Sequence, residues 1–154
     1  MITIGMRTTP KEIFYTIIKS EGKKTTVITS SKLNIPLSME LPEKLSFVRK
    51  TFIDIIAEYK ATSAGIRVSE SNAQKLSIER ISYEAVLQEL LTSSTIETYF
   101  VGQISTISSK IGFKRDQFKK FISGELSFDA IEEWEKYKEN QKESILVAVA
   151  ALKL

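Results

Sequence analysis

The sequence predicts one α/β domain built on a mixed five-stranded sheet with helices on its faces. Two observations predict this class. Over the first thirty residues, apolar and polar residues alternate in short runs separated by turn residues, which is typical of an antiparallel meander. Beyond Pro42 the apolar spacing changes to three or four residues, and helical stretches then alternate with short strands. This order of elements favours a mixed sheet covered by helices.

Three strands are expected in the first thirty residues. Residues 2–6 alternate apolar with small or polar side chains, which is the period of a strand with one buried face. A turn around Pro10 follows, because proline cannot donate to a strand ladder. Residues 13–18 are rich in branched and aromatic side chains, which favour a second strand. A turn at residues 21–24 then leads to a third strand at residues 25–29.

The helical part begins with residues 45–59, where apolar side chains recur at helical spacing and charged ones lie between them. A short central strand is expected at residues 64–68, and it is followed directly by Ser69 and Glu70, where it ends. A second helix is expected at residues 78–91, and a fifth strand at residues 98–101.

The last third of the chain predicts two more helices, at residues 114–121 and 129–152. The second of these is highly charged at first and apolar later. No internal repeat, low-complexity tract or linker is apparent, so the sequence predicts a single domain over residues 1–154.

The composition excludes several kinds of chemistry. The 154 residues include no cysteine and no histidine, so disulfides, thiolate metal sites and a Ser-His-Asp triad are all excluded. The six glycines are scattered, and no phosphate-binding glycine loop indicates a nucleotide cofactor. Any catalysis is expected to depend on carboxylates, with an oxygen-ligated ion such as Mg²⁺ or Mn²⁺.

The amino terminus lacks the features of a signal peptide, and no apolar run has the length of a membrane span. The apolar run at residues 145–152 is too short and is expected to be buried. A soluble, cytoplasmic protein with no membrane partner is therefore the default expectation. The formal charge of +3 permits nucleic-acid binding without requiring it.

Three short stretches match the pattern of a known family. Residues 2–7 keep an apolar-Gly-apolar pattern, Val68-Ser69-Glu70 ends the fourth strand in a glutamate, and residues 140–148 place Glu143 ahead of small apolar residues. With the order of elements, they resemble the ribonuclease H-like superfamily, in particular the RuvC-like branch of Holliday junction resolvases. An uncharacterised bacterial family of RuvC-like domains is similar as well.

The resemblance implies a carboxylate site that is only partly filled. Such resolvases carry an aspartate on the first strand, and two divalent ions roughly 3.5–4 Å apart act on the scissile phosphate. Here the aspartate is absent; Met6 is expected at its position, with Arg7 bringing positive charge close by. By this resemblance Glu70 and Glu143 are remnant catalytic carboxylates, and Glu70 is the candidate ligand for Mg²⁺ or Mn²⁺. The first-strand change indicates that the chain is not an active nuclease.

Each acidic candidate also has a structural interpretation. Glu70 is either a metal ligand or a solvated residue where a strand meets a loop. Glu143 is either part of the site or one charge on the wet face of a charged helix. Glu84 either pairs with Arg67 or Arg80, or contributes to a pocket with Glu70.

A basic cluster is the candidate nucleic-acid surface. It consists of Lys110, Lys114, Arg115, Lys119 and Lys120. These side chains either neutralise phosphates or form a solvated face. Phe113, Phe118 and Phe121 are interleaved with these charges, and they are expected in the core because Lys114, Phe118 and Phe121 recur at helical spacing. Trp134 either packs on the domain or anchors a partner.

Three functions remain open. The first is a catalytically degenerate RuvC-like domain that binds DNA, RNA or a protein partner. The second is a metal-dependent, structure-selective nuclease whose missing ligand comes from Glu79, Glu84 or Asp116. The third is a homodimeric scaffold without a nucleic-acid role, which associates through residues 145–152 or through the second helix.

Overall fold

The computed structural model describes all 154 residues and contains a five-stranded mixed sheet in the order β3-β2-β1-β4-β5. β1, β2 and β3 are antiparallel neighbours, whereas β1, β4 and β5 run parallel. The elements are β1 (Ile2–Thr8), β2 (Glu12–Glu21), β3 (Lys24–Asn34), α1 (Leu41–Tyr59), β4 (Ser63–Arg67), α2 (Ile78–Thr92), β5 (Thr98–Gly102), α3 (Ile104–Ile111), α4 (Arg115–Ser123), the 3₁₀ turn η1 (Trp134–Lys136) and α5 (Glu139–Ala151). The predicted α/β class and the mixed sheet are confirmed.

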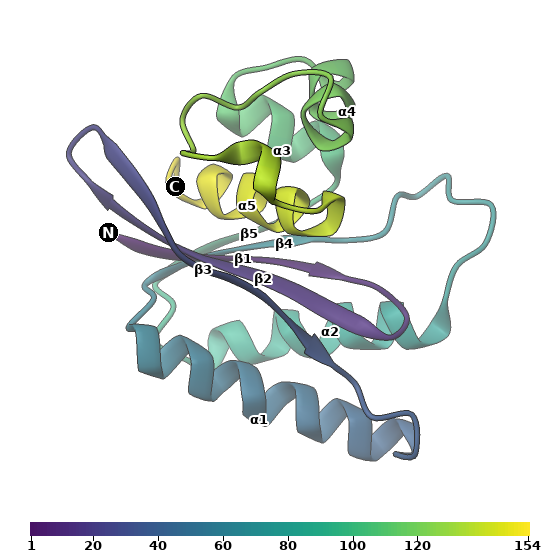
Figure 1. Cartoon of the computed structure of the whole chain (residues 1–154). Coiled ribbons are helices and arrows are strands. Elements are labelled where there is room, and N and C mark those ends of the chain that lie inside the picture. The colour runs from purple at the N-terminus through teal and green to yellow at the C-terminus, as the bar shows by residue number, and fades with distance from the viewer.

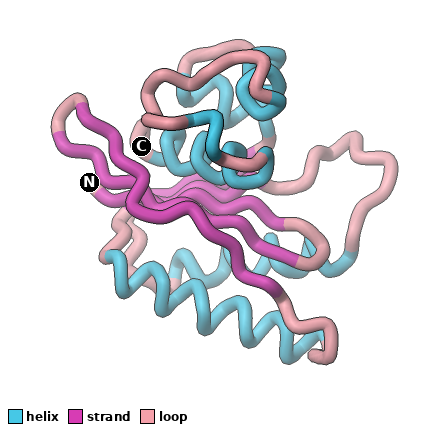
Figure 2. Tube along the Cα trace, in the orientation of Figure 1, coloured by secondary structure: helices cyan, strands magenta, loops and turns pink.

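Helices cover both faces of the sheet (Figure 1). α1 and α2 pack side by side on one face, and α3, α4 and α5 gather on the other. The same layering is visible when the trace is coloured by secondary structure (Figure 2). The loop between β4 and α2 projects from the edge of the sheet at which the parallel strands end (Figure 1).

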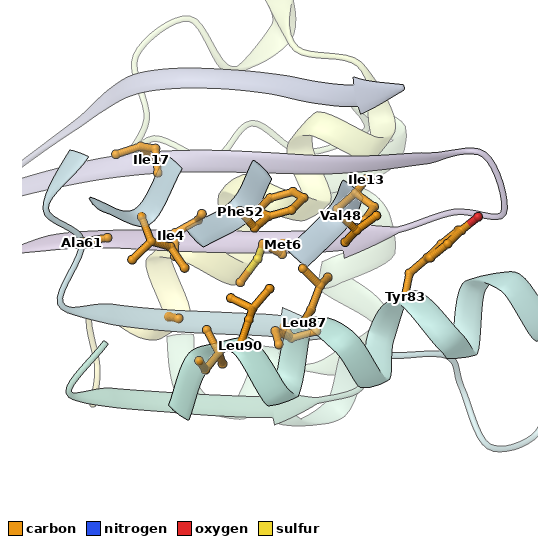
Figure 3. Close-up of a cluster of buried hydrophobic side chains, with 14 of the residues drawn as sticks. Ile4, Met6, Ile13, Ile17, Val48, Phe52, Ala61, Tyr83, Leu87 and Leu90 are labelled. Carbon is orange, nitrogen blue, oxygen red and sulfur yellow. The ribbon is translucent and has the colours of Figure 1, made fainter. Parts of the chain in front are cut away.

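One core lies between the sheet and the α1–α2 layer (Figure 3). Ile4 and Met6 of β1 meet Phe52 of α1 and Leu87 of α2, and all four side chains are fully buried. Because successive residues of a strand face opposite ways, the intervening residues of β1 face the other helices. Met6 is therefore a core residue on the side of the sheet away from α5.

A second core lies between the sheet and α5, which crosses β1 and β4 closely. A Cβ atom on Gly5 would lie 2.2 Å from the backbone nitrogen of Ala148 and 2.3 Å from the carbonyl oxygen of Ser144. The Thr3 and Ser63 hydroxyls donate to α5 carbonyls at 2.9 Å. The contact needs glycine in β1, and it fixes α5 across the central strands β1 and β4.

The apolar carboxyl-terminal stretch at residues 145–152 packs in the second core as predicted: residues 145–151 are buried in α5, and Leu152 is partly buried. It cannot also serve as a dimer surface, so that part of the homodimer hypothesis is wrong. No helix combines the length and the apolar character that crossing a membrane requires.

Two predictions about the last third of the chain are wrong. Helix α3 was not expected, because its sequence Ile-Ser-Thr-Ile-Ser-Ser-Lys-Ile is rich in residues that favour turns. The predicted helix at residues 129–152 begins only at Glu139. Glu133 adopts the left-handed conformation with φ of 53°, and the 3₁₀ turn that follows buries Trp134 in the second core.

Burial of Trp134 excludes its role as an exposed anchor for a partner. Its indole nitrogen donates to the Phe121 carbonyl at 3.1 Å, and its side chain is 1% exposed. Phe118 belongs to the same core, and Phe113 and Phe121 pack against it, so the prediction that these aromatics are core residues is confirmed.

Candidate functional site

Two arginines lie side by side where β1 and β4 end. Arg7 and Arg67 are register partners in the parallel pairing of these strands. Both side chains face α5, because each stands two residues beyond a glycine, Gly5 or Gly65, over which α5 packs. The prediction that Met6 stands at the position of the first-strand aspartate is therefore wrong. Arg7 is the β1 residue that faces the carboxylates, since Met6 points into the opposite core.

Glu143 of α5 lies against both guanidinium groups. Its Oε2 atom is 3.1 Å from Arg7 Nε and 2.9 Å from Arg67 Nε. Like charges opposite each other in a sheet are destabilising, so one carboxylate offsets the repulsion between two cations. The Glu143 side chain is only 12% exposed, which excludes the interpretation as one charge on a wet helical face.

Arg67 is the most confined member of this group. Burial lowers the pKa of its guanidinium below the ordinary value, Glu143 opposes that shift, and Arg7 adds to it. Its Nε and Nη1 atoms are buried without a hydrogen-bond partner, although Nε lies at ion-pair distance from Glu143. The charge of Arg67 is thus compensated by proximity, while part of its donor capacity is unused.

Glu70 follows β4 and lies at the amino terminus of α3. Its Oε1 accepts the N–H of Ile104 at 3.0 Å and lies 3.8 Å from Arg67 Nη2. Its Oε2 lies 3.4 Å from Arg115 Nη2. With 19% of the side chain exposed and three partners around it, Glu70 is not simply a solvated residue at the end of a strand.

Glu84 lies across the sheet, on α2. Its Oε1 accepts from Arg80 Nε at 3.0 Å, and from the Thr8 hydroxyl and both the N–H and the hydroxyl of Ser69 at 2.9 Å. Of the two arginines predicted as its partner, Arg80 is the correct one. Glu84 also lines a pocket of about 450 Å³ with Glu70, but four donors already occupy one of its oxygens.

These carboxylates do not fit the two-ion site that the resemblance implies. Glu70 and Glu143 share the Arg67 guanidinium, and nowhere do three acidic side chains converge in a way that could hold a metal ion. The predicted substitutes Glu79 and Asp116 are exposed in the first turns of α2 and α4. A divalent ion at this place would have to displace a guanidinium first.

The structure brings together only part of the predicted basic cluster. Arg115 and Lys119 line a polar pocket of about 480 Å³ with Asn72 and Asp116. Lys114 is exposed next to them, and Lys120 is partly buried on the same helix. Lys110 lies apart, with its Nζ 5.3 Å from the centre of the Phe100 ring.

Sequence reasoning missed Arg67 as a central member of the site and misplaced Arg7. The signal for both was present, because strict alternation from the two glycines places each arginine on the α5 face. Their shared partner Glu143 could not be identified, since the contact depends on how α5 crosses the sheet.

No protein-family model and no curated protein matches the sequence. Solved structures do match. RuvC of Thermus thermophilus is 7% identical, with 99% of this chain and 94% of that chain covered and a TM-score of 0.76. The same protein in complex with a Holliday junction substrate is 8% identical over 99% and 94% of the two chains, with a TM-score of 0.70.

The Fowlpox virus resolvase in complex with Holliday junction DNA is 14% identical over 97% of this chain and 95% of that chain, with a TM-score of 0.57. At identities this low the likeness concerns the fold and carries no residue roles. The alignments nevertheless extend over nearly the whole chain, with every strand of the sheet included. The chain therefore has the RuvC-like ribonuclease H fold of the Holliday junction resolvases.

Proposed function

We propose that this chain is a nucleic-acid-binding RuvC-like domain that does not carry out metal-dependent catalysis. Guanidinium groups lie where such a nuclease would hold its metal ions. The observation that carries the proposal is the pairing of Arg7 and Arg67 with Glu143. A carboxylate that neutralises two guanidinium groups is not available as a ligand for a divalent ion. Without such ions a nuclease of this type lacks the charge that stabilises its transition state.

The surface around this site supports binding of a polyanion. Arg115 joins the basic side chains of α4 to the site, because it pairs with Glu70 while half of its side chain remains exposed. Exposed Lys114 and Lys119 extend the positive surface along α4. Solved structures of the same fold contain Holliday junction DNA, so the fold is compatible with a branched nucleic acid.

The test is binding of fluorescent junction, duplex and single-stranded DNA and RNA in the presence of EDTA. We expect dissociation constants on the order of 10⁻⁴ to 10⁻⁶ M that weaken steeply with salt. The combined substitutions Lys114→Gln, Arg115→Gln and Lys119→Gln should lower the slope of log K against log salt by about 3, or about 1 for each phosphate contact.

The control removes three exposed positive charges elsewhere, through Lys23→Gln, Lys24→Gln and Lys50→Gln, and should leave that slope unchanged. Absence of salt-dependent binding by the native chain would contradict the proposal. Cleavage of branched DNA in Mg²⁺ or Mn²⁺ that disappears with Glu70→Gln would favour the nuclease hypothesis instead.

Helix α2 favours a second candidate, a homodimeric scaffold. Ile78 and Ile81 on its outer face are 74% and 41% exposed, and neighbouring Leu76 is 52% exposed. Apolar side chains grouped in this way are often covered by a partner. This candidate retains the second-helix part of the homodimer hypothesis.

For this candidate we expect sedimentation to give about twice the chain mass of 17.4 kDa. The double change Ile78→Glu and Ile81→Glu should return the mass to that of one chain. Leu37→Glu alters an equally exposed apolar residue outside α2 and should leave the dimer intact. A native chain that stays monomeric at high concentration would exclude the scaffold.

A further inference from the structure

The surroundings of the Glu70 carboxylate form a set of donors suited to an anion. One oxygen accepts the first N–H of α3, that of Ile104, at 3.0 Å. The same oxygen lies 3.8 Å from Arg67, and the other lies 3.4 Å from Arg115. We call this arrangement of the α3 amino terminus, Arg67 and Arg115 the Glu70 cradle.

A phosphate group would be recognised by the same kinds of donor. The amino terminus of a helix offers unpaired N–H groups and the positive end of the helix dipole, and phosphates bind there readily. Guanidinium groups add charge and paired donors that fit the oxygens of a phosphate. The Glu70 carboxylate thus occupies the position that an oxyanion would take.

Arg67 gives independent evidence that this place suits an anion. Arg67 is 6% exposed, so its charge is almost completely removed from water. Nε has only the ion-pair contact with Glu143, and Nη1 has no partner at all. Buried donors without partners are costly, and an additional anion nearby would compensate them. Arg80 Nη2 of the neighbouring layer is unpaired in the same way.

The charges of the whole cluster also fall short of neutrality. Four arginines, Arg7, Arg67, Arg80 and Arg115, contact three glutamates, Glu70, Glu84 and Glu143. The cluster therefore carries one net positive charge at the end of the parallel strands. A site built for a divalent cation would carry the opposite excess.

We propose that Glu70 is the internal occupant of an anion site, and that a backbone phosphate of the bound nucleic acid displaces it without a metal ion. The inference rests on the proposed nucleic-acid binding and names the group that the site takes. Glu70 is attached to the loop that begins after β4, so its side chain can leave the cradle toward solvent. Glu70 lines the pocket of about 450 Å³, and Arg115 is 52% exposed and lines the polar pocket with Lys119, so the cradle is open to solvent at both side chains.

The proposal predicts that Glu70→Gln strengthens the binding of nucleic acid. If Glu70 were a metal ligand, the same change would not strengthen it. The amide can still accept the Ile104 N–H, but it no longer competes with phosphate by charge. Glu70→Gln should therefore bind fluorescent DNA in EDTA at least tenfold more tightly than the native chain. It should also bind inorganic phosphate at least tenfold more tightly, measured by phosphorus NMR.

Two further variants separate this site from a general charge effect. Glu79→Gln removes the same charge from the exposed first turn of α2 and should change DNA affinity less than threefold. Adding Arg115→Gln to Glu70→Gln should abolish the gain for both ligands, because it removes the accessible guanidinium of the cradle.

The outcomes for the two ligands are distinguishable. Phosphate binding that depends on Glu70 and Arg115, without binding of DNA or RNA, would support the anion site and overturn the proposed function. DNA binding that Glu70→Gln leaves unchanged or weakens would overturn the anion site and leave the proposed function standing. If neither ligand responds to Glu70→Gln, Glu70 is only a cap for α3 and the inference is wrong.

Discussion

Glu143→Gln should lower the free energy of unfolding by about 3–5 kcal/mol, which is typical when one partner of a buried ion pair is removed. The neutral amide leaves Arg7 and Arg67 as adjacent cations on one face of the sheet. Their side chains are 14% and 8% exposed, so water screens the repulsion poorly. Urea unfolding followed by circular dichroism measures the loss.

An exposed pair of the same type provides the control. Glu89 Oε2 lies 2.8 Å from Arg49 Nε, but the two side chains are 55% and 41% exposed. Glu89→Gln should therefore cost no more than about 1 kcal/mol. An equally small loss for Glu143→Gln would mean that solvent reaches the two arginines and that Glu143 does not stabilise them.

Removing one of the two arginines should restore part of the stability. In the variant that combines Arg7→Met with Glu143→Gln, a single guanidinium remains and the repulsion disappears. We expect the double variant to be more stable than Glu143→Gln alone, although Arg7→Met alone destabilises the native chain. Such non-additive behaviour is the sign of residues that form one network.

The fold could be predicted from local patterns because its elements have clear periods. The three amino-terminal strands and helices α1 and α2 carry an alternation of two or a spacing of three to four residues. The failures occurred where local preference and tertiary packing disagree. α3 is helical although half of its residues are serine or threonine. The charged residues between Asp129 and Glu139 are not helical as predicted, and Trp134 among them packs in the second core.

The candidate site could be predicted only in part, since its chemistry depends on contacts between distant segments. Glu70 and Glu143 were identified through the family pattern, and Glu84 through an arginine four residues before it. The decisive contact joins Arg7 to Glu143 across almost the whole sequence. Alternation along β1 could have placed Arg7 on that face, but no local pattern shows which helix covers it.

A second large effect is expected from replacing the two arginines at the strand ends. Combining Arg7→Asp with Arg67→Gln should create a site for Mn²⁺, whereas we expect the native chain not to bind the ion. Glu70 and Glu143 both contact the Arg67 guanidinium, so removing it leaves two carboxylates around an empty position. The new carboxylate at position 7 adds a third oxygen ligand on β1, and hard divalent ions prefer such ligands.

Without Mn²⁺, the variant with Arg7→Asp and Arg67→Gln should be less stable than the native chain, because its three carboxylates repel one another. Mn²⁺ at ten times its dissociation constant should restore about 1.4 kcal/mol, which is roughly 3–6 °C in melting temperature for a chain of this size. Calorimetric titration and thermal unfolding measure the two effects. We expect a dissociation constant on the order of 10⁻⁴ M, similar to weak carboxylate sites for divalent ions.

The matched control is Arg7→Asn with Arg67→Gln, which opens the same space without adding a charge. It should bind Mn²⁺ at least tenfold more weakly than the aspartate variant. If the native chain itself binds Mn²⁺ as tightly as the aspartate variant, the arginines do not block the carboxylates and the degenerate site is disproved. Binding only after both changes would mean that the arginines on β1 and β4 are what separates this chain from a metal-binding RuvC-like domain.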